Sequence, residues 1–384
     1  MKSPTIAARR SRALLTGYFF GLGTVMAMWG ARMPAIQQTA HLTTGQLTVV
    51  LLAAALGMVA GLQTAGRLAH LDRLPILISV GAVSLAGCLA LLGQCRSLPT
   101  LLTTALAFGM AHGVLDVAVN SAAVQCQTAY GRPIMSSLHA AYSIGALGAA
   151  ALAAVTARTG HSLLFLVTGL VLAGAFLALA PTARTLSGTD QPLAPVASRQ
   201  CEAPPPRLTA GRVWLLGVLA AASLLGEGAA ADWAAVHLHS LDASTAVSAA
   251  AFALYSGAMA IGRLAGDRLT AGFGSTTVIR AGAVLAAAGL TTGVVTSSTP
   301  VALAGWALFG LGLSITVPSL MTAAGAGGPR ALATVAVIGY LGLLAGPALI
   351  GALAVVVTLS TALLLPALLA AAVAALAPRA LEKP

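Results

Sequence analysis

Three polar residues stand one helical turn apart inside an apolar run at residues 99–126: His112, Asp116 and Asn120. Residues four apart share a helix face, so the three side chains form one polar stripe. An ionisable group inside a bilayer is costly and is functional by default, and a carboxyl in a low-dielectric cavity can bind and release a proton near neutral pH. We predict that Asp116 carries a proton and that His112 and Asn120 contact a solute. The alternative is a structural hydrogen bond from Asp116 to a neighbouring helix.

A second apolar run, residues 213–238, contains Glu227 near its middle and Asp232 nearer its end. Five residues turn a helix by about 140° beyond a full turn, so the two carboxylates point in different directions and are expected to have different roles. Glu227 is the second predicted proton-coupling residue. The alternative for Glu227 is a hydrogen bond to a serine or threonine of another helix.

Further solute-binding candidates are a histidine and two tryptophans. His139 stands with Ser136 and Ser143 on one side of the run at 135–157. It can relay protons or bind a solute, or it can form a hydrogen bond between helices. Trp29 and Trp233 are predicted to stack on a solute, and the alternative is that they anchor their helices at the membrane interface.

The composition requires lipid as the surrounding solvent. Of the 384 residues, 58% are hydrophobic and 8% are charged, whereas soluble domains carry about 25% charged residues. The net charge of +11 does not indicate nucleic acid as a partner, because the basic residues stand singly at the ends of apolar runs. The four cysteines form no CxxC or Cys/His spacing, so no metal and no cofactor are expected.

The apolar runs predict an all-α membrane protein with twelve transmembrane helices in two sets of six. The first set is expected at 13–36, 44–66, 75–94, 99–126, 135–157 and 161–181, and the second at 213–238, 244–262, 276–296, 300–323, 331–356 and 359–378. The only long polar segment lies between them. The predicted organisation is an N-terminal six-helix half at 1–181, a cytoplasmic linker at 182–212 and a C-terminal six-helix half at 213–384.

The basic residues predict the orientation of the chain in the membrane. With both termini in the cytoplasm, 17 of the 20 Lys and Arg residues fall on the cytoplasmic side. Only Arg32, Arg96 and Arg158 fall on the other side. Because cytoplasmic loops carry an excess of Lys and Arg, this split supports cytoplasmic termini and an even number of spans.

A short motif recurs after the second and the eighth predicted span, as GRLAHLDR at residues 66–73 and GRLAGDRL at 262–269. Six plus six helices, a central linker and this loop motif resemble the major facilitator superfamily, whose motif has a glycine followed four or five residues later by Asp and then by basic residues. The first copy departs from the pattern, since His70 stands near the usual place of the Asp. The resemblance covers essentially the whole chain, and it implies the fold of that superfamily and transport by alternating access.

Two further stretches, residues 113–120 and 227–233, resemble an uncharacterised bacterial branch of the superfamily. That branch is distantly similar to fucose-permease-type sugar:proton symporters, which also carry an acid in span 4 with a downstream Asn. The resemblance implies a multi-pass protein of the bacterial inner (plasma) membrane.

The superfamily places spans 1 and 7 against each other at the outer mouth. Arg32 follows Arg12 by twenty residues, and Asp232 follows Arg212 by twenty residues, so both lie about 30 Å from the cytoplasmic ends of their helices. Arg32 and Asp232 are therefore predicted to form an outer gate. The alternative is that Arg32 alone reaches into the lipid headgroups.

The predicted function is secondary active transport, coupled to protons, of a small polar neutral or cationic solute. The helix interiors hold three acids, Asp116, Glu227 and Asp232, against one base, Arg32, and this surplus repels anions. The partners expected are the solute, protons and the lipid bilayer, and the protein is expected to be a monomer.

The sequence leaves two alternatives to this function open and disfavours a third class. Proton-antiport efflux of a drug or secondary metabolite is favoured by the small residues and proline at 342–351, because drug:proton antiporters of the superfamily carry a similar pattern in span 5. A non-transporting membrane receptor is more remote. An enzyme is not expected, because the sequence contains no HExxH motif and no nucleophile–base pair.

Overall fold

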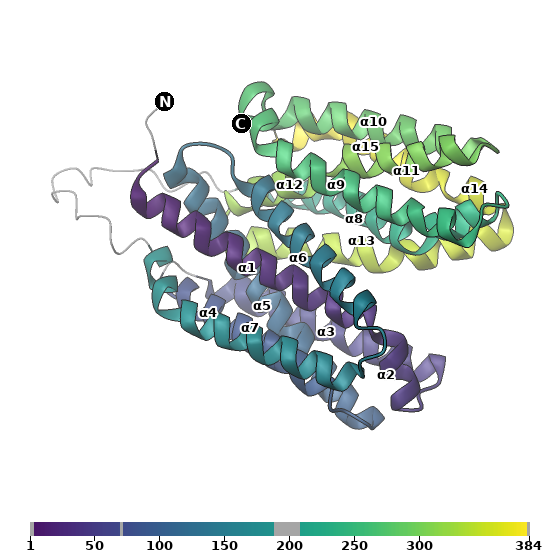
Figure 1. Cartoon of the computed structure of the whole chain (residues 1–384). Helices are drawn as coiled ribbons and strands as arrows, with labels where there is room; N and C mark the ends of the chain where they lie inside the picture. Colours follow the sequence, from purple (N-terminus) through teal and green to yellow (C-terminus); the bar gives the residue numbers. More distant parts are fainter. Residues whose placement is uncertain (1–3, 70–71, 188–207, 382–384) are drawn as a thin grey trace. The chain divides into compact units, whose positions relative to one another are not determined.

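The computed structural model describes residues 4–69, 72–187 and 208–381, and within these ranges it contains helices and no β-strand (Figure 1). Twelve helical segments in the described chain are long and apolar enough to cross a membrane. The predicted all-α membrane fold with twelve spans is confirmed. Most of the predicted linker, residues 188–207, and His70 and Leu71 of the first motif copy lie outside the described residues.

The first six spans are the helices α1 and α3 to α7. The bounds are α1 Ile6–Ala31, α2 Met33–Thr39, α3 Thr44–Leu68, α4 Leu74–Leu92, α5 Leu98–Tyr130, α6 Met135–Val155 and α7 His161–Ala183, followed by a short 3-10 helix at Arg184–Ser187. The first span begins earlier than predicted, because the side chain of Thr5 accepts a hydrogen bond from the Ala8 backbone and caps the helix.

The remaining six spans are built from eight helices. Their bounds are α8 Ala210–His239, α9 Thr245–Phe273, α10 Ser275–Val295, α11 Thr299–Leu313, α12 Thr316–Gly325, α13 Pro329–Val356, α14 Leu359–Ala362 and α15 Leu364–Leu381. One span is formed by α11 and α12 together, and another by α14 and α15. The tenth span is therefore discontinuous near its middle.

The chain forms two compact units. Unit 1 consists of residues 1–131, 141–207 and 327–333, and unit 2 consists of 132–140, 208–326 and 334–384. The two units differ from the predicted halves at two places. The first turn of α6 belongs to unit 2, and the first turn of α13 belongs to unit 1. The reason is local contact: Asp267 of α9 accepts hydrogen bonds from the backbone of Ser136 and Ser137, and Gly66 of α3 lies against Ala333.

The closest helix pair of unit 1 is α3 and α5, which meet backbone to backbone. Gly57 and Gly61 of α3 face carbonyl oxygens of α5, and Gly109 and Gly113 of α5 face carbonyl oxygens of α3. A methyl group at any of these four positions would overlap a backbone atom of the opposite helix. Small residues at this spacing let membrane helices approach closely, so the α3–α5 contact forms a rigid frame.

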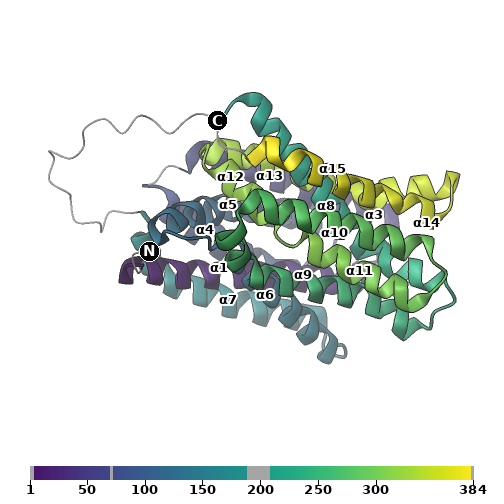
Figure 2. The same cartoon turned by 90° about the horizontal axis from the view of Figure 1, so that it is seen from above.

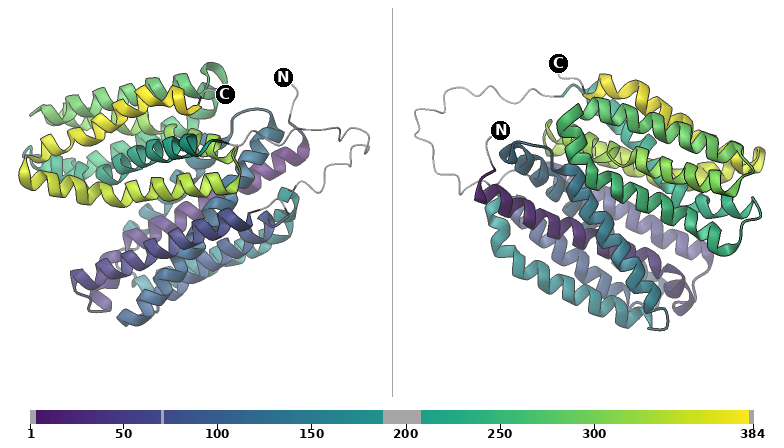
Figure 3. Two further views of the ribbon diagram at one scale, coloured as in Figure 1. Left: turned by 180° about the vertical axis from the view of Figure 1, so that it is seen from behind. Right: turned by 45° about the horizontal axis from the view of Figure 1, so that its top comes forward.

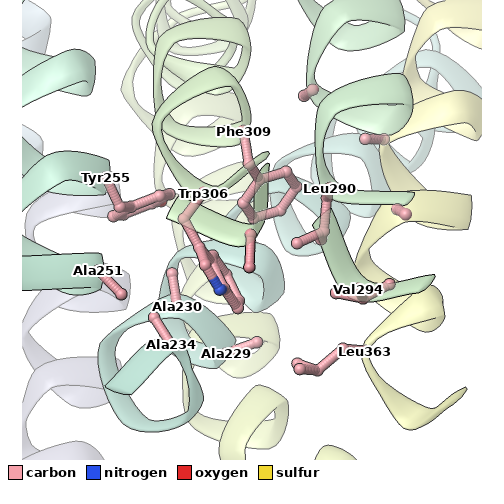
Figure 4. Close-up of a cluster of buried hydrophobic side chains, with 14 of the residues drawn as sticks. Ala229, Ala230, Ala234, Ala251, Tyr255, Leu290, Val294, Trp306, Phe309 and Leu363 are labelled. Atoms are coloured by element: carbon pink, nitrogen blue, oxygen red, sulfur yellow. The ribbon is translucent and has the colours of Figure 1, made fainter. Parts of the chain in front are cut away.

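The other helices of each unit pack in pairs as well. In unit 1, α4 lies beside α7, and Figure 3 shows these purple to teal helices from two further directions. In unit 2, α10 lies beside α11 and α15 (Figure 2). The core of unit 2 is a hydrophobic cluster around Trp306 and Phe309 of α11, with Tyr255 of α9 packed against Phe309 (Figure 4).

One helix departs from the prediction in a way that matters for function. The eighth span was expected to end at residue 262, but α9 continues to Phe273, so the second motif copy, residues 262–269, is helical and not a loop. The helix runs through Gly266 and Gly272 and ends at Gly274, whose φ is +79°. The prediction of a loop was wrong, and the helix carries Arg263 to a buried position.

The α3–α5 frame can be tested by adding one methyl group. We expect Gly109→Ala to lower the unfolding free energy by roughly 1–3 kcal/mol, because its Cβ would collide with the carbonyl of Ala54. The matched control is Gly174→Ala in α7, where a Cβ meets open space. The measurement is thermal unfolding of both purified variants in detergent. Equal unfolding temperatures for the two variants would contradict the proposed frame.

Candidate functional site

The first buried carboxylate lies in α5. His112, Asp116 and Asn120 are 5%, 6% and 1% exposed. The Nδ2 of Asn120 donates to the Asp116 backbone carbonyl at 2.9 Å and to the Asp116 Oδ1 at 3.2 Å. The downstream Asn therefore holds the carboxylate against its own helix.

The α3–α5 frame fixes the position of this stripe. Gly113 follows His112 directly and faces the carbonyl of Met58 on α3, while Gly61 of α3 faces the carbonyl of Met110. The prediction from sequence did not include these contacts. The signal for them is the pair of GxxxG patterns at 57–61 and 109–113, which indicates close helix packing in a membrane.

The second buried carboxylate has a cation as its partner. The Nη2 of Arg263 on α9 lies 3.4 Å from the Oε1 of Glu227 on α8, and the two side chains are 8% and 19% exposed. The sequence had offered a serine or threonine as the alternative partner of Glu227, and the structure provides an arginine instead. The sequence count, which has Arg32 as the one base inside the helices, is therefore wrong. The predicted loop at residues 262–269 would have put Arg263 outside them.

The same arginine also contacts the break in the tenth span. Its Nε donates to the backbone carbonyl of Ser314 at 3.4 Å, and Ser314 lies between the end of α11 and the start of α12. The hydroxyl of Ser314 turns back to the carbonyl of Leu311 at 2.6 Å. Discontinuous membrane helices with freed carbonyls are common at the binding sites of transporters.

Two further ionisable side chains lie near this ion pair. Tyr255, which is buried on α9, is within electrostatic range of both Glu227 and Arg263. His139, in the first turns of α6, is within range of Arg263. The structure thus brings the predicted residues Glu227 and His139 to one region of unit 2, with Arg263 at its centre.

The predicted gate residues lie in different units. Arg32 follows α1 and donates to the carbonyls of Ala153, Thr156 and Ala157 at the end of α6. Asp232 is exposed on α8. Arg32 thus has partners within unit 1, and its pairing with Asp232 stays a prediction.

Both predicted tryptophans have protein partners within their own units. Trp29 is buried in unit 1 against the ring of Phe108, with centroids 5.3 Å apart. The Nε1 of Trp233 donates to the carbonyl of Pro347 on α13 at 3.1 Å. Gly342 and Gly346 of α13 face backbone carbonyls of α8, which is the close packing that the small residues of this run predict. Solute contact by either tryptophan stays a prediction.

His237 is another ionisable group in a spanning helix that the sequence did not single out. His237 of α8 is fully buried, and its Nδ1 accepts a hydrogen bond from the Nε1 of Trp306 at 3.3 Å. Its place inside the apolar run at 213–238 could have singled it out. Among the described residues, no three His, Cys, Asp or Glu side chains are grouped so as to hold a metal ion.

Comparison with known proteins identifies the class of protein. The family model described as Major Facilitator Superfamily matches residues 14–329. The chain is 34% identical to the uncharacterized transporter y4wD of Sinorhizobium fredii, over 96% of this chain and 97% of that protein. It is 33% identical to an uncharacterized MFS-type transporter of Yersinia pestis, over 93% and 92% of the two chains.

A solved structure shows the same fold. The crystal structure of the E. coli fucose:proton symporter FucP superposes with a TM-score of 0.73 at 17% identity, and the match covers 97% of this chain and 98% of that one. The family model and the two relatives named as transporters place the chain among membrane transporters. The chain belongs to the major facilitator superfamily, as its resemblance predicts.

The contacts of Arg32 generate a test of stability. We expect Arg32→Ala to lower the unfolding free energy by about 1–3 kcal/mol, because the last carbonyls of α6 lose their donor. Arg158→Ala is the matched control, since the Arg158 side chain is exposed. Thermal unfolding followed by tryptophan fluorescence measures the difference. An Arg32→Ala variant as stable as Arg158→Ala would argue against this role.

Proposed function

We propose that the chain is a proton-coupled secondary transporter that moves a small polar neutral or cationic solute across the bacterial plasma membrane by alternating access. The observation that carries the proposal is Asp116, a carboxylate buried inside a spanning helix and held by Asn120. Adding or removing one proton there changes the local charge in a low-dielectric site, which changes the relative energies of conformations that expose or bury it.

The solute class rests on the charges inside the spans. Among the charged side chains that are not exposed and lie away from the helix ends, Asp116 and Glu227 are acids and Arg263 is a base, so the formal balance there is −1. A negative balance still disfavours anions. The solved structure that shares the fold is a fucose:proton symporter, and fucose is a polar neutral sugar.

The remaining candidates have assigned roles in this proposal. Glu227 is a second proton-coupling residue, His112, Asn120, His139, Trp29 and Trp233 contact the solute, and Arg32 and Asp232 form the outer gate. Two of the three outer arginines, Arg32 and Arg96, bind carbonyls at helix ends. These contacts explain why Arg32 and Arg96 stand on the side of the membrane that carries few basic residues. The two exceptions therefore do not count against the orientation with both termini in the cytoplasm.

The test of proton coupling is Asp116→Asn in proteoliposomes, assayed with L-fucose, D-xylose and a panel of other sugars, polyols and amino sugars. We expect the variant to lose accumulation driven by a pH gradient, down to the level of protein-free liposomes. Counterflow of the same solute should persist, because only the proton carrier is removed. The control is Asp242→Asn, which changes an exposed carboxylate between α8 and α9. Normal gradient-driven accumulation by Asp116→Asn would refute the assignment.

The solute class is tested by competition. We expect excess sugar phosphate or dicarboxylate to leave transport of the neutral or cationic solute unchanged, because the negative balance of the spans repels anions. The measurement is inhibition of radiolabelled uptake, with the unlabelled solute as positive control. Displacement by a phosphate ester would show that the charge argument is wrong.

A further inference from the structure

Three arginines gather at one end of unit 1. Because successive spans cross in alternate directions, α1, α4 and α6 end where α3, α5 and α7 begin. Figure 1 shows α2 and the link between α6 and α7 at this end. The links there contain Arg32, Arg96 and Arg158, and we call it the basic end of unit 1.

The basic end has no acid to balance its charge. The described residues of unit 1 include two acids: Asp116 lies near the middle of α5, and Asp72 lies between α3 and α4, which is the opposite end. The backbone carbonyls that Arg32 and Arg96 bind are neutral, so both guanidiniums keep their full charge. The corresponding links of unit 2 contain one aspartate and no Lys or Arg: 240–244, 296–298 and 357–358. The excess of positive charge therefore belongs to unit 1.

Hydrogen bonds hold one of these arginines against the start of α7. The Nη2 of Arg96 donates to the Oγ of Ser162 at 2.6 Å, and its Nη1 donates to the carbonyls of Gly93 and Cys95, both at 2.9 Å. The Nε2 of Gln94 donates to the Ser162 carbonyl at 3.0 Å. The link from α4 to α5 is thus fastened to the first turn of α7.

The first residue of α7 has the other two arginines nearby. His161 is within electrostatic range of both Arg96 and Arg32, so the two guanidiniums lie near the same imidazole. Arg158 stands three residues earlier in the chain and is exposed. His161 is 6% exposed, and its Nε2 has no hydrogen-bond partner among the described residues. This end of unit 1 therefore has both charge and hydrogen-bonding capacity that the described part of the chain leaves unused.

The helix terminus adds to the same potential. The residue before α7 is Gly160, and no side chain of that residue caps the helix. The first N–H groups of a helix carry partial positive charge and favour anions. A phosphate group supplies the missing negative charge, and its oxygens accept hydrogen bonds from guanidinium groups.

Apolar side chains beside the arginines indicate what kind of molecule carries the phosphate. Leu91 at the end of α4, Val155 at the end of α6 and Leu163 in the first turn of α7 are 59%, 82% and 58% exposed. In a chain that spans a bilayer, such side chains contact acyl chains. A phosphate with acyl chains attached matches both parts of this surface, whereas a free phosphate matches one.

We propose that the basic end of unit 1 binds the phosphodiester headgroup of an anionic membrane phospholipid, whose acyl chains lie along the exposed apolar side chains of α4, α6 and α7. The site belongs to unit 1 alone. It needs neither a solute nor a proton gradient, so it is independent of the proposed transport function.

The experiment maps where a lipid headgroup contacts the full-length protein. The probe is phosphatidylglycerol with a photoreactive diazirine in its headgroup, added at a low fraction to phosphatidylcholine nanodiscs that contain the protein. After illumination, crosslinked peptides are identified by mass spectrometry. We expect crosslinks within residues 93–98 and 156–163. Their absence from both segments, while other parts of the chain are crosslinked, would overturn the proposal.

Four variants test whether the charge of the arginines holds the lipid. Arg158→Gln should lower the crosslink yield in the two segments about fivefold, the effect of one basic residue near anionic lipid. Arg96→Gln/Arg158→Gln should lower it on the order of twentyfold, since two such contacts are lost. Arg158→Lys keeps the charge and should keep the yield, as should Arg280→Gln, which changes an exposed arginine of α10 in unit 2. A wild-type yield in Arg158→Gln, or an equal loss in Arg280→Gln, would show that the site is wrong.

Competition identifies the source of the phosphate. An excess of unlabelled phosphatidylglycerol should abolish the crosslinks in the two segments, and the same excess of phosphatidylcholine should leave them. Glycerol phosphate, which carries the phosphate without acyl chains, should also leave them. Equal competition by phosphatidylcholine would mean that charge is not recognised, and equal competition by glycerol phosphate would mean that the ligand is a free phosphate. Either result would contradict the lipid site.

Discussion

The hydrocarbon core of a bilayer offers no water to hydrogen-bond with, so every backbone polar group and every charge in it needs a partner within the protein. The helices satisfy their own backbone groups except at their ends and at breaks. Arginines fill that need at three places: Arg32 at the end of α6, Arg96 at the end of α4 and Arg263 at the break after α11. Asn120 does the same for the carboxylate of Asp116.

The same constraint explains how much could be predicted from the sequence. Apolar runs must span the bilayer, so the number of helices follows from composition, and Asp116 and Glu227 are recognisable because charges there are rare. The partners of these charges could not be predicted, since they depend on which helices pack together. The sequence predicts a loop at Arg263 because the matching motif of the superfamily lies between two spans, whereas α9 continues to Phe273 and Arg263 lies beside Glu227.

The two carboxylates differ in what holds them, and this difference has functional meaning. Asn120 is a neutral amide. Protonation of Asp116 therefore changes the hydrogen bond between the two side chains, and Asn120 has no charge that could lose its partner. Arg263 is a cation, so a proton on Glu227 disturbs an ion pair that joins helices.

The central claim, that solute and proton move together, is tested most directly by proton movement driven by the solute alone. Proteoliposomes containing a pH-sensitive dye receive L-fucose, or another solute that the protein binds, on one side without an imposed pH gradient. The account predicts a change in internal pH that follows the solute, with a sign that distinguishes symport from antiport. Solute flux with no accompanying pH change would contradict it.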